Sequence, residues 1–291
     1  MRVYRSLDEV AVLPHGTPRA VAIGTFDGVH VGHQRIIGMA MDAARAMQGV
    51  STVVTFEPHP AMVLHPESAP AILTPLEVKI DLLEHLGVDE VIAIPFTREF
   101  AALSPDEFCG RLLSQRLGAR QVSVGANFRF GRQGRGGAAD LLSFGQAQGF
   151  SVSAIHLIEA EGQVVSSTRI RRLVAEGDVE TAARLLTRPH TLVGRVVAGA
   201  GRGRTMGMPT ANMEPPADAA VPALGVYATR TRVPQWPIQD SVTSVGTNPT
   251  FENDNVVRIE TFLLDFHGTL YDVSMGIDFV ARLRDQRTFS S

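Results

Sequence analysis

The sequence predicts two domains: an α/β domain with a parallel sheet over residues 1–188, followed by a smaller β-barrel over residues 189–291. Its 291 residues suffice for two domains at roughly 150 residues each. From residue 20 to about 188, apolar strands alternate with amphipathic helices, which favours parallel strands joined by crossover helices. From His190 onward, short β-prone runs are separated by Gly, Pro and Asn, a spacing typical of a small barrel.

In the first domain the expected elements follow one another with clear boundaries. Capping boxes with proline at the first helical position mark two helix starts, at 74–77 and 104–107, and Gly87 closes the first of these helices. We expect strands at 20–23, 51–56, 90–94, 121–124 and 150–158, and helices at 33–47, 74–87, 104–118, 138–148 and 178–186. After a short linker around Arg188 and Pro189, we expect strands at 192–197, 226–233, 242–245, 256–266 and 270–273.

Composition narrows the class of protein. Lys and Arg number 27 against 30 Asp and Glu, so no basic excess indicates nucleic acid, and no apolar stretch of about 18 residues predicts a membrane span. The N-terminus resembles neither a signal nor a transit peptide, so we expect a cytoplasmic protein. The single cysteine, Cys109, excludes an intramolecular disulfide, and its helical apolar surroundings favour a small buried hydrophobe over a nucleophile.

The stretch 22–34, AIGTFDGVHVGHQ, has the outline of a phosphate site. A predicted strand ends at Gly24, and glycines let the following loop approach a ligand closely before a helix begins. Unpaired N–H groups and the helix dipole favour an anion at that helix start. His30 and His33, with Gly32 between them, can face the same phosphate. A purely structural loop is the less favoured alternative.

Two further loops follow predicted strands, where ligands gather in open sheets of this kind. One is Glu57-Pro58-His59-Pro60, which can equally be a turn set by its two prolines. The other is 125–131, whose continuation at 132–137 is rich in Arg and Gly. That continuation suits an anion-binding loop or a solvated connection equally well.

The segment 166–171, SSTRIR, places hydroxyl groups at a helix start ahead of two arginines, where a polyphosphate would find donors and positive charge. A capped surface helix with solvated arginines is the plainer alternative.

Two stretches of the predicted barrel carry chemistry. The segment 194–207, GRVVAGAGRGRTMG, is rich in glycine and arginine and is followed by MPTAN. A glycine-rich loop could cover phosphates, and the hydroxyl and amide that follow could bind Mg²⁺. A mobile hairpin is the alternative. Glu260 has apolar neighbours, which predict either a pKa raised toward that of a general base or a solvent-facing position on an edge strand.

These motifs resemble one family. GTFDGVHVGH is similar to the HxGH signature of nucleotidyltransferases, and in its longer form it resembles the adenylyltransferase half of bacterial bifunctional riboflavin kinase/FMN adenylyltransferases. TFEPHP, FRFG and SSTRIR resemble further motifs of that half, with Asn127 standing where many members carry Asp. GRTMGMPTAN and SVGTNPTF resemble the riboflavin kinase signature and its flavin-side loop.

The resemblance implies a Rossmann-like nucleotidyltransferase domain followed by a riboflavin kinase-like barrel. It implies catalytic roles for His30, His33, Arg169 and Glu260, with Arg169 on the triphosphate and Glu260 as base for the ribityl hydroxyl. It places Mg²⁺ and ATP at Thr210 and Asn212. The implied ATP- and flavin-binding residues are Gly24, Phe26, Asp27, Asn127, Ser166, Ser167, Thr168, Gly203, Arg204, Gly207 and Asn248.

The implied activity is synthesis of FAD in two steps. Riboflavin and ATP would give FMN in the barrel domain, and FMN and ATP would then give FAD and pyrophosphate in the α/β domain. Expected partners are therefore these small molecules, with no nucleic acid and no membrane, and a homo-oligomer is left open. Ala198 and Phe262 replace histidines that many members carry, and the sequence ends at RLRDQRTFSS, where the family continues into a C-terminal helix. The alternative is therefore an adenylyltransferase alone, with the β domain as a flavin-binding or regulatory module.

Overall fold

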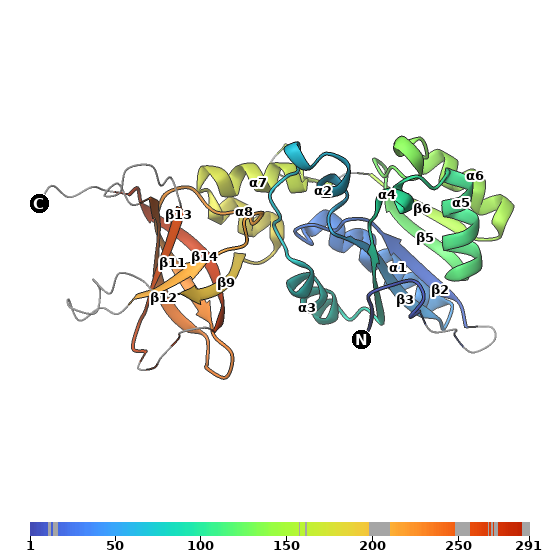
Figure 1. The fold of residues 1–291 in the computed structure, drawn as a ribbon. Coiled ribbons are helices and arrows are strands. Elements are labelled where there is room, and N and C mark those ends of the chain that lie inside the picture. The colour runs from blue at the N-terminus through green and yellow to red at the C-terminus, as the bar shows by residue number, and fades with distance from the viewer. Residues whose placement is uncertain are drawn as a thin grey trace, which may run out of the picture. The chain divides into compact units, whose positions relative to one another are not determined.

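The computed structural model describes residues 1–10, 13, 17–156, 158–160, 162–197, 210–247, 257–266, 268, 270 and 273–286. The chain forms two compact units, which are Met1–Pro70 with Thr74–Val165, and Ala71–Leu73 with Ser166–Ser291 (Figure 1). Among the described residues, no helix has both the length and the apolar character needed to cross a bilayer.

The first unit is built on a six-stranded sheet in the order β1-β4-β3-β2-β5-β6. Its strands are β1 (Arg2–Tyr4), β2 (Arg19–Ile23), β3 (Val50–Glu57), β4 (Glu90–Pro95), β5 (Ala119–Gly125) and β6 (Ser151–Ile155). Every neighbouring pair is parallel, which confirms the predicted Rossmann-like sheet. The chain moves outward from β2 to β4 and then returns past β2 to β5. Ligands of open α/β sheets bind beyond the carboxyl ends of strands at such a reversal.

Helices cover both faces of this sheet. The helices and short helical turns of the unit are α1 (Val31–Ala46), α2 (Pro60–Leu64), η1 (Pro66–Ser68), α3 (Leu76–Leu86), α4 (Arg98–Ala101), α5 (Pro105–Glu107), the π-type helix η2 (Phe108–Arg116), η3 (Arg132–Gly134) and α6 (Ala138–Gln148). A small antiparallel pair, β7 (Glu159–Ala160) and β8 (Gln163–Val164), completes it.

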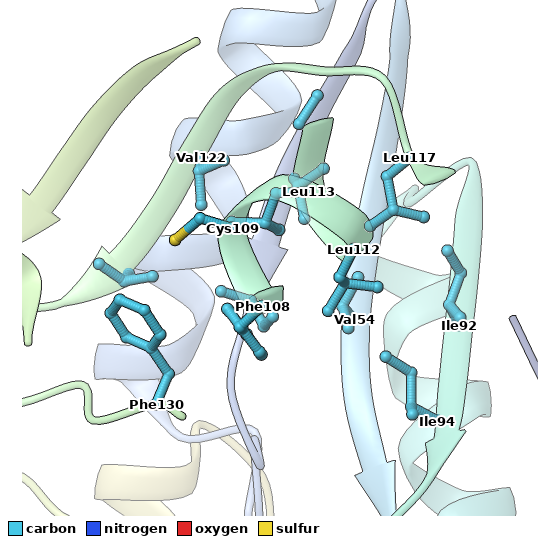
Figure 2. Close-up of a cluster of buried hydrophobic side chains, with 14 of the residues drawn as sticks. Val54, Ile92, Ile94, Phe108, Cys109, Leu112, Leu113, Leu117, Val122 and Phe130 are labelled. Carbon is cyan, nitrogen blue, oxygen red and sulfur yellow. The ribbon is translucent and has the colours of Figure 1, made fainter. Parts of the chain in front are cut away.

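Two apolar clusters hold these layers together. Figure 2 shows η2 on one face, where its side chains pack with Val54, Ile92, Ile94 and Val122. On the other face α1 and α3 pack with Ala22, Val53 and Val91. Since Val91 and Ile92 are consecutive, β4 is buried on both faces, as strands of parallel sheets commonly are. Cys109 lies in the first cluster and is fully buried, and burial raises the pKa of its thiol to about 12, so the predicted buried hydrophobe is confirmed.

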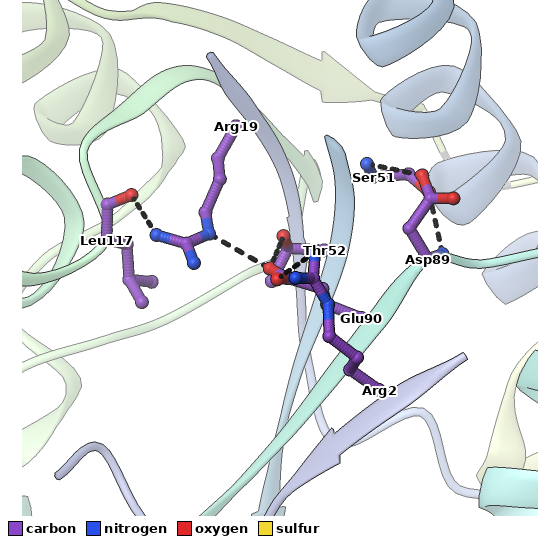
Figure 3. A network of polar contacts seen from close by, with 7 residues as sticks. All are labelled: Arg2, Arg19, Ser51, Thr52, Asp89, Glu90 and Leu117. Atoms are coloured by element: carbon purple, nitrogen blue, oxygen red, sulfur yellow. Dashed lines mark hydrogen bonds and ion pairs between the residues drawn. The ribbon is translucent and has the colours of Figure 1, made fainter. Parts of the chain in front are cut away.

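A buried ion-pair network joins strands at the amino end of the sheet (Figure 3). Glu90, the first residue of β4, is fully buried, and its Oε2 lies 2.9 Å from Nε of Arg19. The same oxygen accepts a hydrogen bond from Thr52 Oγ1 at 3.0 Å, and Oε1 lies 2.8 Å from the guanidinium group of Arg2. Arg19 also donates to the carbonyl of Leu117 at 3.1 Å. These contacts tie four strand beginnings together at the edge opposite the expected ligand site.

The two predicted capping boxes have different outcomes. Ser104 and Glu107 form theirs at α5, as predicted. The box predicted at Thr74 is wrong, because Pro75 is extended (ψ 156°), α3 begins at Leu76 and the start has no side-chain cap. The N–H of Thr74 instead donates to Asp27 Oδ1 at 2.9 Å. Gly87, with φ 88°, closes α3 as predicted.

The second unit contains a closed barrel in the order β10-β13-β12-β11-β14-β9, which confirms the predicted barrel. Its strands are β9 (His190–Val197), β10 (Thr210–Glu214), β11 (Gly225–Arg232), β12 (Gln239–Thr247), β13 (Val257–Leu263) and β14 (Ser274–Arg284). The interior combines an apolar cluster with a chain of buried hydroxyl groups joined at 2.8 to 3.0 Å, formed by Thr231, Ser241, Thr229, Thr243 and Thr261.

Helices α7 (Ser167–Glu176) and α8 (Val179–Leu186) belong to this second unit. Val179 lies in the apolar cluster of the barrel, and Glu180 accepts the N–H of Arg282 at 3.1 Å. The sequence places both helices before a boundary at residue 188, and that boundary stays a prediction about the domains.

The strand prediction at 270–273 is wrong. Leu270 and Val273 lie outside any strand, and β14 begins at Ser274. Its alternating buried residues Met275, Ile277 and Phe279 form the period-2 pattern of a half-buried strand. The prediction also missed β1 and β10, because three and five residues carry too little periodic signal.

Candidate functional site

The loop from Gly24 to His30 connects β2 to α1 beside the reversal of strand order. Three of its residues have left-handed backbone angles, Phe26 (φ 48°), Gly28 (φ 94°) and Val29 (φ 43°). Residues other than glycine adopt this conformation at an energetic cost, so their surroundings must hold them there. Phe26 and Val29 are each only 1% exposed, so packing supplies part of that restraint.

His30 and His33 stack on each other at the start of α1. Their ring centroids are 3.6 Å apart with 21° between the planes. His30 is the N-cap, and its Nδ1 accepts the backbone N–H of His33 at 3.3 Å, which leaves the proton of the neutral ring on Nε2. A β-carbon at Gly32 would lie 3.1 Å from Cε1 of His30, so glycine gives that ring its room. Both imidazoles lie at the start of α1, and their action on a common phosphate stays a prediction.

A second set of polar contacts lies on the α3 side of this loop. Lys79 on α3 is 4% exposed, and its Nζ donates to the carbonyl of Thr25 at 2.8 Å and to Thr55 Oγ1 at 3.3 Å. Thr55 Oγ1 donates to the same carbonyl at 3.0 Å. Burial lowers the pKa of Lys79, and the charges of Asp27 and Glu57 partly oppose that shift. No motif in the sequence indicates this group.

Asp27 contributes to the same support, because it is 2% exposed and accepts the N–H of Thr74. The family resemblance implies that Asp27 binds ATP or flavin. The Thr74 N–H gives the buried carboxylate a hydrogen-bond partner, and the role of Asp27 toward a ligand stays a prediction.

The predicted loop after β5 lies across the reversal point from the histidine loop. Asn127 is exposed there, in a turn closed by a hydrogen bond from Phe128 N–H to the Gly125 carbonyl at 2.9 Å. A β-carbon at Gly125 would lie 3.6 Å from Cδ1 of Ile36 on α1, so this loop approaches the helix that begins at the histidines. After β3, His59 caps α2 by accepting the N–H of Ala61 at 3.2 Å.

The SSTRIR segment forms the start of α7 in the second unit. Ser166 is the N-cap and accepts the N–H of Arg169 at 3.2 Å, with Ser167 and Thr168 in the first turn. Arg171 donates to the Ala71 carbonyl at 2.6 Å, which gives it a structural contact. The capped helix start is confirmed. The phosphate role of Arg169 stays a prediction, because this helix and the stacked histidines belong to different compact units.

In the barrel, pairing register aligns the predicted kinase residues. Asn212 on β10 pairs with Glu260 on β13, and Glu260 pairs in turn with Ser244 on β12. Thr210 lies two residues before Asn212 and therefore on the same face of its strand. Glu260 is exposed, so its solvent-facing position is confirmed, whereas the predicted edge strand is wrong because β13 pairs on both sides. Gly203, Arg204, Gly207 and Asn248 lie outside the described residues.

Comparison with known proteins identifies both halves. Residues 14–169 match the family described as FAD synthetase, and residues 186–291 match the family described as riboflavin kinase. A Listeria monocytogenes protein named "Bifunctional riboflavin kinase/FMN adenylyltransferase" is 38% identical over 274 residues, which span 94% of this chain and 86% of the relative. The chain belongs to the bifunctional riboflavin kinase/FMN adenylyltransferase family.

Other members of this family match along the whole chain. A Pseudomonas fluorescens protein of the same name is 38% identical, with 100% of this chain and 92% of the relative covered. A solved structure titled "Crystal Structure of Macrolide-efflux Protein from Streptococcus pneumoniae" is 30% identical with a TM-score of 0.86, covering 99% of this chain and 92% of that one. This similarity supports the fold of the present chain. Macrolide efflux is the role named for the Streptococcus pneumoniae protein only.

Proposed function

We propose that this chain makes FAD in two steps, with riboflavin phosphorylated to FMN at the barrel and FMN joined to AMP in the α/β unit. The observation that carries the proposal is the pair of stacked histidines at the start of α1, beside the reversal point of a parallel sheet. The matches to both family descriptions and to full-length bifunctional relatives support the same two activities.

Adenylyl transfer needs two anions to be oriented and new negative charge to be stabilised. A phosphate oxygen of FMN attacks the α-phosphorus of ATP, the bond to the β-phosphate oxygen breaks, and pyrophosphate leaves, so no protein nucleophile is needed. His30 and His33 would donate to the phosphoryl oxygens, and the N-terminus of α1 adds its dipole and N–H groups there. Arg169, with Ser166, Ser167 and Thr168 at the start of α7, would bind the triphosphate.

Riboflavin phosphorylation requires a base for the ribityl hydroxyl and a cation on ATP. Glu260 would accept the hydroxyl proton, and its exposed position leaves it accessible to substrate. Asn212, opposite Glu260 in the register, and Thr210 present oxygen atoms from the same strand face. Gly203, Arg204, Gly207 and Asn248 would complete the ATP and flavin contacts by the family resemblance.

Mg²⁺ fits this donor set. The described residues contain no cluster of three or more His, Cys, Asp or Glu side chains that would enclose a metal by themselves. Mg²⁺ characteristically keeps several waters and takes one or two protein oxygens together with substrate phosphates, which Thr210 and Asn212 could provide. When bound with ATP, it would neutralise phosphate charge during transfer.

A product assay tests both steps. Purified protein is incubated with Mg-ATP and either riboflavin or FMN, and the flavins are resolved by chromatography. We expect FMN and FAD from riboflavin and FAD from FMN, with Glu260→Gln losing only the first conversion. FAD from FMN alone would instead indicate an adenylyltransferase with a flavin-binding β domain, and no FAD from either substrate would refute the proposal. Light scattering during size-exclusion chromatography would test for a homo-oligomer.

A further inference from the structure

The 27 basic residues of this chain include a single lysine, Lys79, and all the others are arginines. A lysine in water would be the ordinary placement, because lysine is almost never fully buried without compensation. Lys79 is 4% exposed. The one ammonium side chain in the protein therefore occupies an unfavourable environment, directly against the loop that leads to the stacked histidines.

We propose that Lys79 is a positioning residue for adenylyl transfer, whose ammonium group holds the Thr25 carbonyl and thereby fixes the loop that presents His30. The inference rests on the proposed adenylyltransferase function. Thr25 is the second residue beyond the end of β2, and its carbonyl receives hydrogen bonds from both Lys79 Nζ and Thr55 Oγ1. Lys79 also donates to Thr55, so the three groups form a closed triangle.

This triangle is placed where the loop most needs restraint. Left-handed backbone at Phe26 and Val29 persists only if contacts around it fix the chain path. Two such contacts come from Lys79 on α3, which bonds the Thr25 carbonyl, and from the N–H of Thr74, ahead of α3, which bonds Asp27. On the other side, Gln34 donates to the Val29 carbonyl at 2.9 Å. The loop is therefore fixed both where it leaves β2 and where it enters α1.

The chemistry of the position suits lysine better than arginine. An ammonium group is compact and can direct its donors at two oxygens, whereas a planar guanidinium group needs a wider acceptor arrangement. Burial lowers the pKa of Lys79, and Asp27 and Glu57 act in the opposite direction by favouring its charged form. A charged Lys79 also places positive charge near the phosphate-binding loop, where low dielectric strengthens its effect on a bound anion.

Three isosteric or near-isosteric variants test the role by kinetics. Lys79→Met removes the ammonium group, and Thr55→Val removes the hydroxyl from the triangle. Thr52→Val is the matched control, because Thr52 is equally buried on β3 but bonds Glu90 at the opposite end of the sheet. We expect kcat for FAD formation to fall about 10- to 100-fold in K79M and about 3- to 10-fold in T55V. We expect it to stay within about twofold in T52V, and riboflavin phosphorylation to be unchanged in all three.

Equal losses in K79M and T52V would mean a general effect on stability and would overturn the proposal, as would K79M with wild-type FAD formation. If the wild-type protein makes no FAD from FMN, the proposed function itself is refuted. If the wild-type protein makes FAD and K79M makes it equally well, only the role of Lys79 is refuted.

A second measurement needs no variant. Because the chain has one lysine, labelling with [¹³C]lysine gives a single side-chain Cε signal for Lys79. We expect this signal to move when Mg-ATP is added, and its titration midpoint to rise because phosphate charge favours the ammonium form. A signal that stays unchanged at saturating Mg-ATP, in a sample that forms FAD once FMN is added, would overturn the proposal even if K79M fails to fold.

Discussion

Each end of the parallel sheet contains a buried cation and a buried threonine of β3, but the two cations bond different kinds of group. At the amino end, Arg19 contacts the carboxylate of Glu90 directly, and Thr52 bonds the same carboxylate. At the carboxyl end, the described bonds of Lys79 go to a carbonyl and a hydroxyl oxygen, next to left-handed backbone. The first arrangement bonds its cation directly to a carboxylate, whereas the second bonds its cation to neutral oxygens, with the charges of Asp27 and Glu57 acting from nearby.

This difference shows that the burial of a charged side chain does not by itself distinguish a structural role from a functional one. A buried charge with a complete set of opposite charges is compatible with a purely structural role. A buried charge bonded to neutral groups at the ligand-binding edge of an open sheet indicates a functional site, because buried groups with perturbed pKa values gather at such sites. The comparison predicts that substitutions at the amino end change stability and those at the carboxyl end change turnover.

The largest expected effect is at Glu90. Glu90→Gln keeps the shape but leaves Arg19 buried without its opposite charge, so we expect unfolding free energy to fall by about 3 to 5 kcal/mol. Urea unfolding measures this loss. FAD formation by the folded fraction should stay near wild type, and a strong loss of kcat at unchanged stability would reverse the assignment of the two ends.

His30→Ala should have the largest effect on chemistry. Removing one group that stabilises developing phosphoryl charge typically lowers kcat about 10²- to 10³-fold, and we expect that loss for FAD formation. Riboflavin phosphorylation by the same preparation serves as the folding control and should be retained. Wild-type pyrophosphate release from FMN and ATP would remove His30 from the mechanism.

A smaller effect is expected in how the contribution of Lys79 to stability depends on pH. The pKa of Lys79 is lowered from 10.5 in the folded protein, so between its folded and unfolded pKa values the unfolded chain binds more protons. Wild-type stability relative to K79M should therefore rise as pH increases through this window, which ends near 10.5, and should be lower and independent of pH below the window. Urea midpoints of both proteins across that range measure the trend, and parallel pH profiles would contradict it.

The smallest effect is expected at Arg2, which sharpens the contrast within the amino-end network. Its side chain is 52% exposed, so its ion pair with Glu90 is screened by solvent. Arg2→Met should change unfolding free energy by at most about 1 kcal/mol, far less than Glu90→Gln. Chemical denaturation of both variants side by side gives the comparison, and equal losses would show that the exposed pair matters as much as the buried one.

Much of this architecture follows from local sequence signals. Alternating apolar strands and helices predict the parallel sheet, and the sequence around His30 and His33 places both of them at one helix start. Other features depend on long-range pairing that local patterns do not contain. Thr74 was predicted to cap a helix, but a bond to Asp27, 47 positions earlier, uses its N–H instead. Asn212 and Glu260 are brought together by the long-range pairing of β10 with β13.

The sequence contains one sign that Lys79 is unusual, but it does not indicate where the residue lies. Its position on α3 gives no motif, and its partners Thr25 and Thr55 are 54 and 24 positions away. Its uniqueness as the single lysine is visible in composition, but only the structure shows that it is buried against the histidine loop.

The most direct test is steady-state FAD formation from FMN and Mg-ATP by wild-type, H30A and E90Q proteins, at a temperature where far-UV circular dichroism shows all three to be folded. We expect E90Q to match wild type in kcat, whereas H30A should lose about two orders of magnitude or more. The opposite pattern, with H30A active and E90Q inactive, would contradict the division of the sheet into a structural amino end and a catalytic carboxyl end.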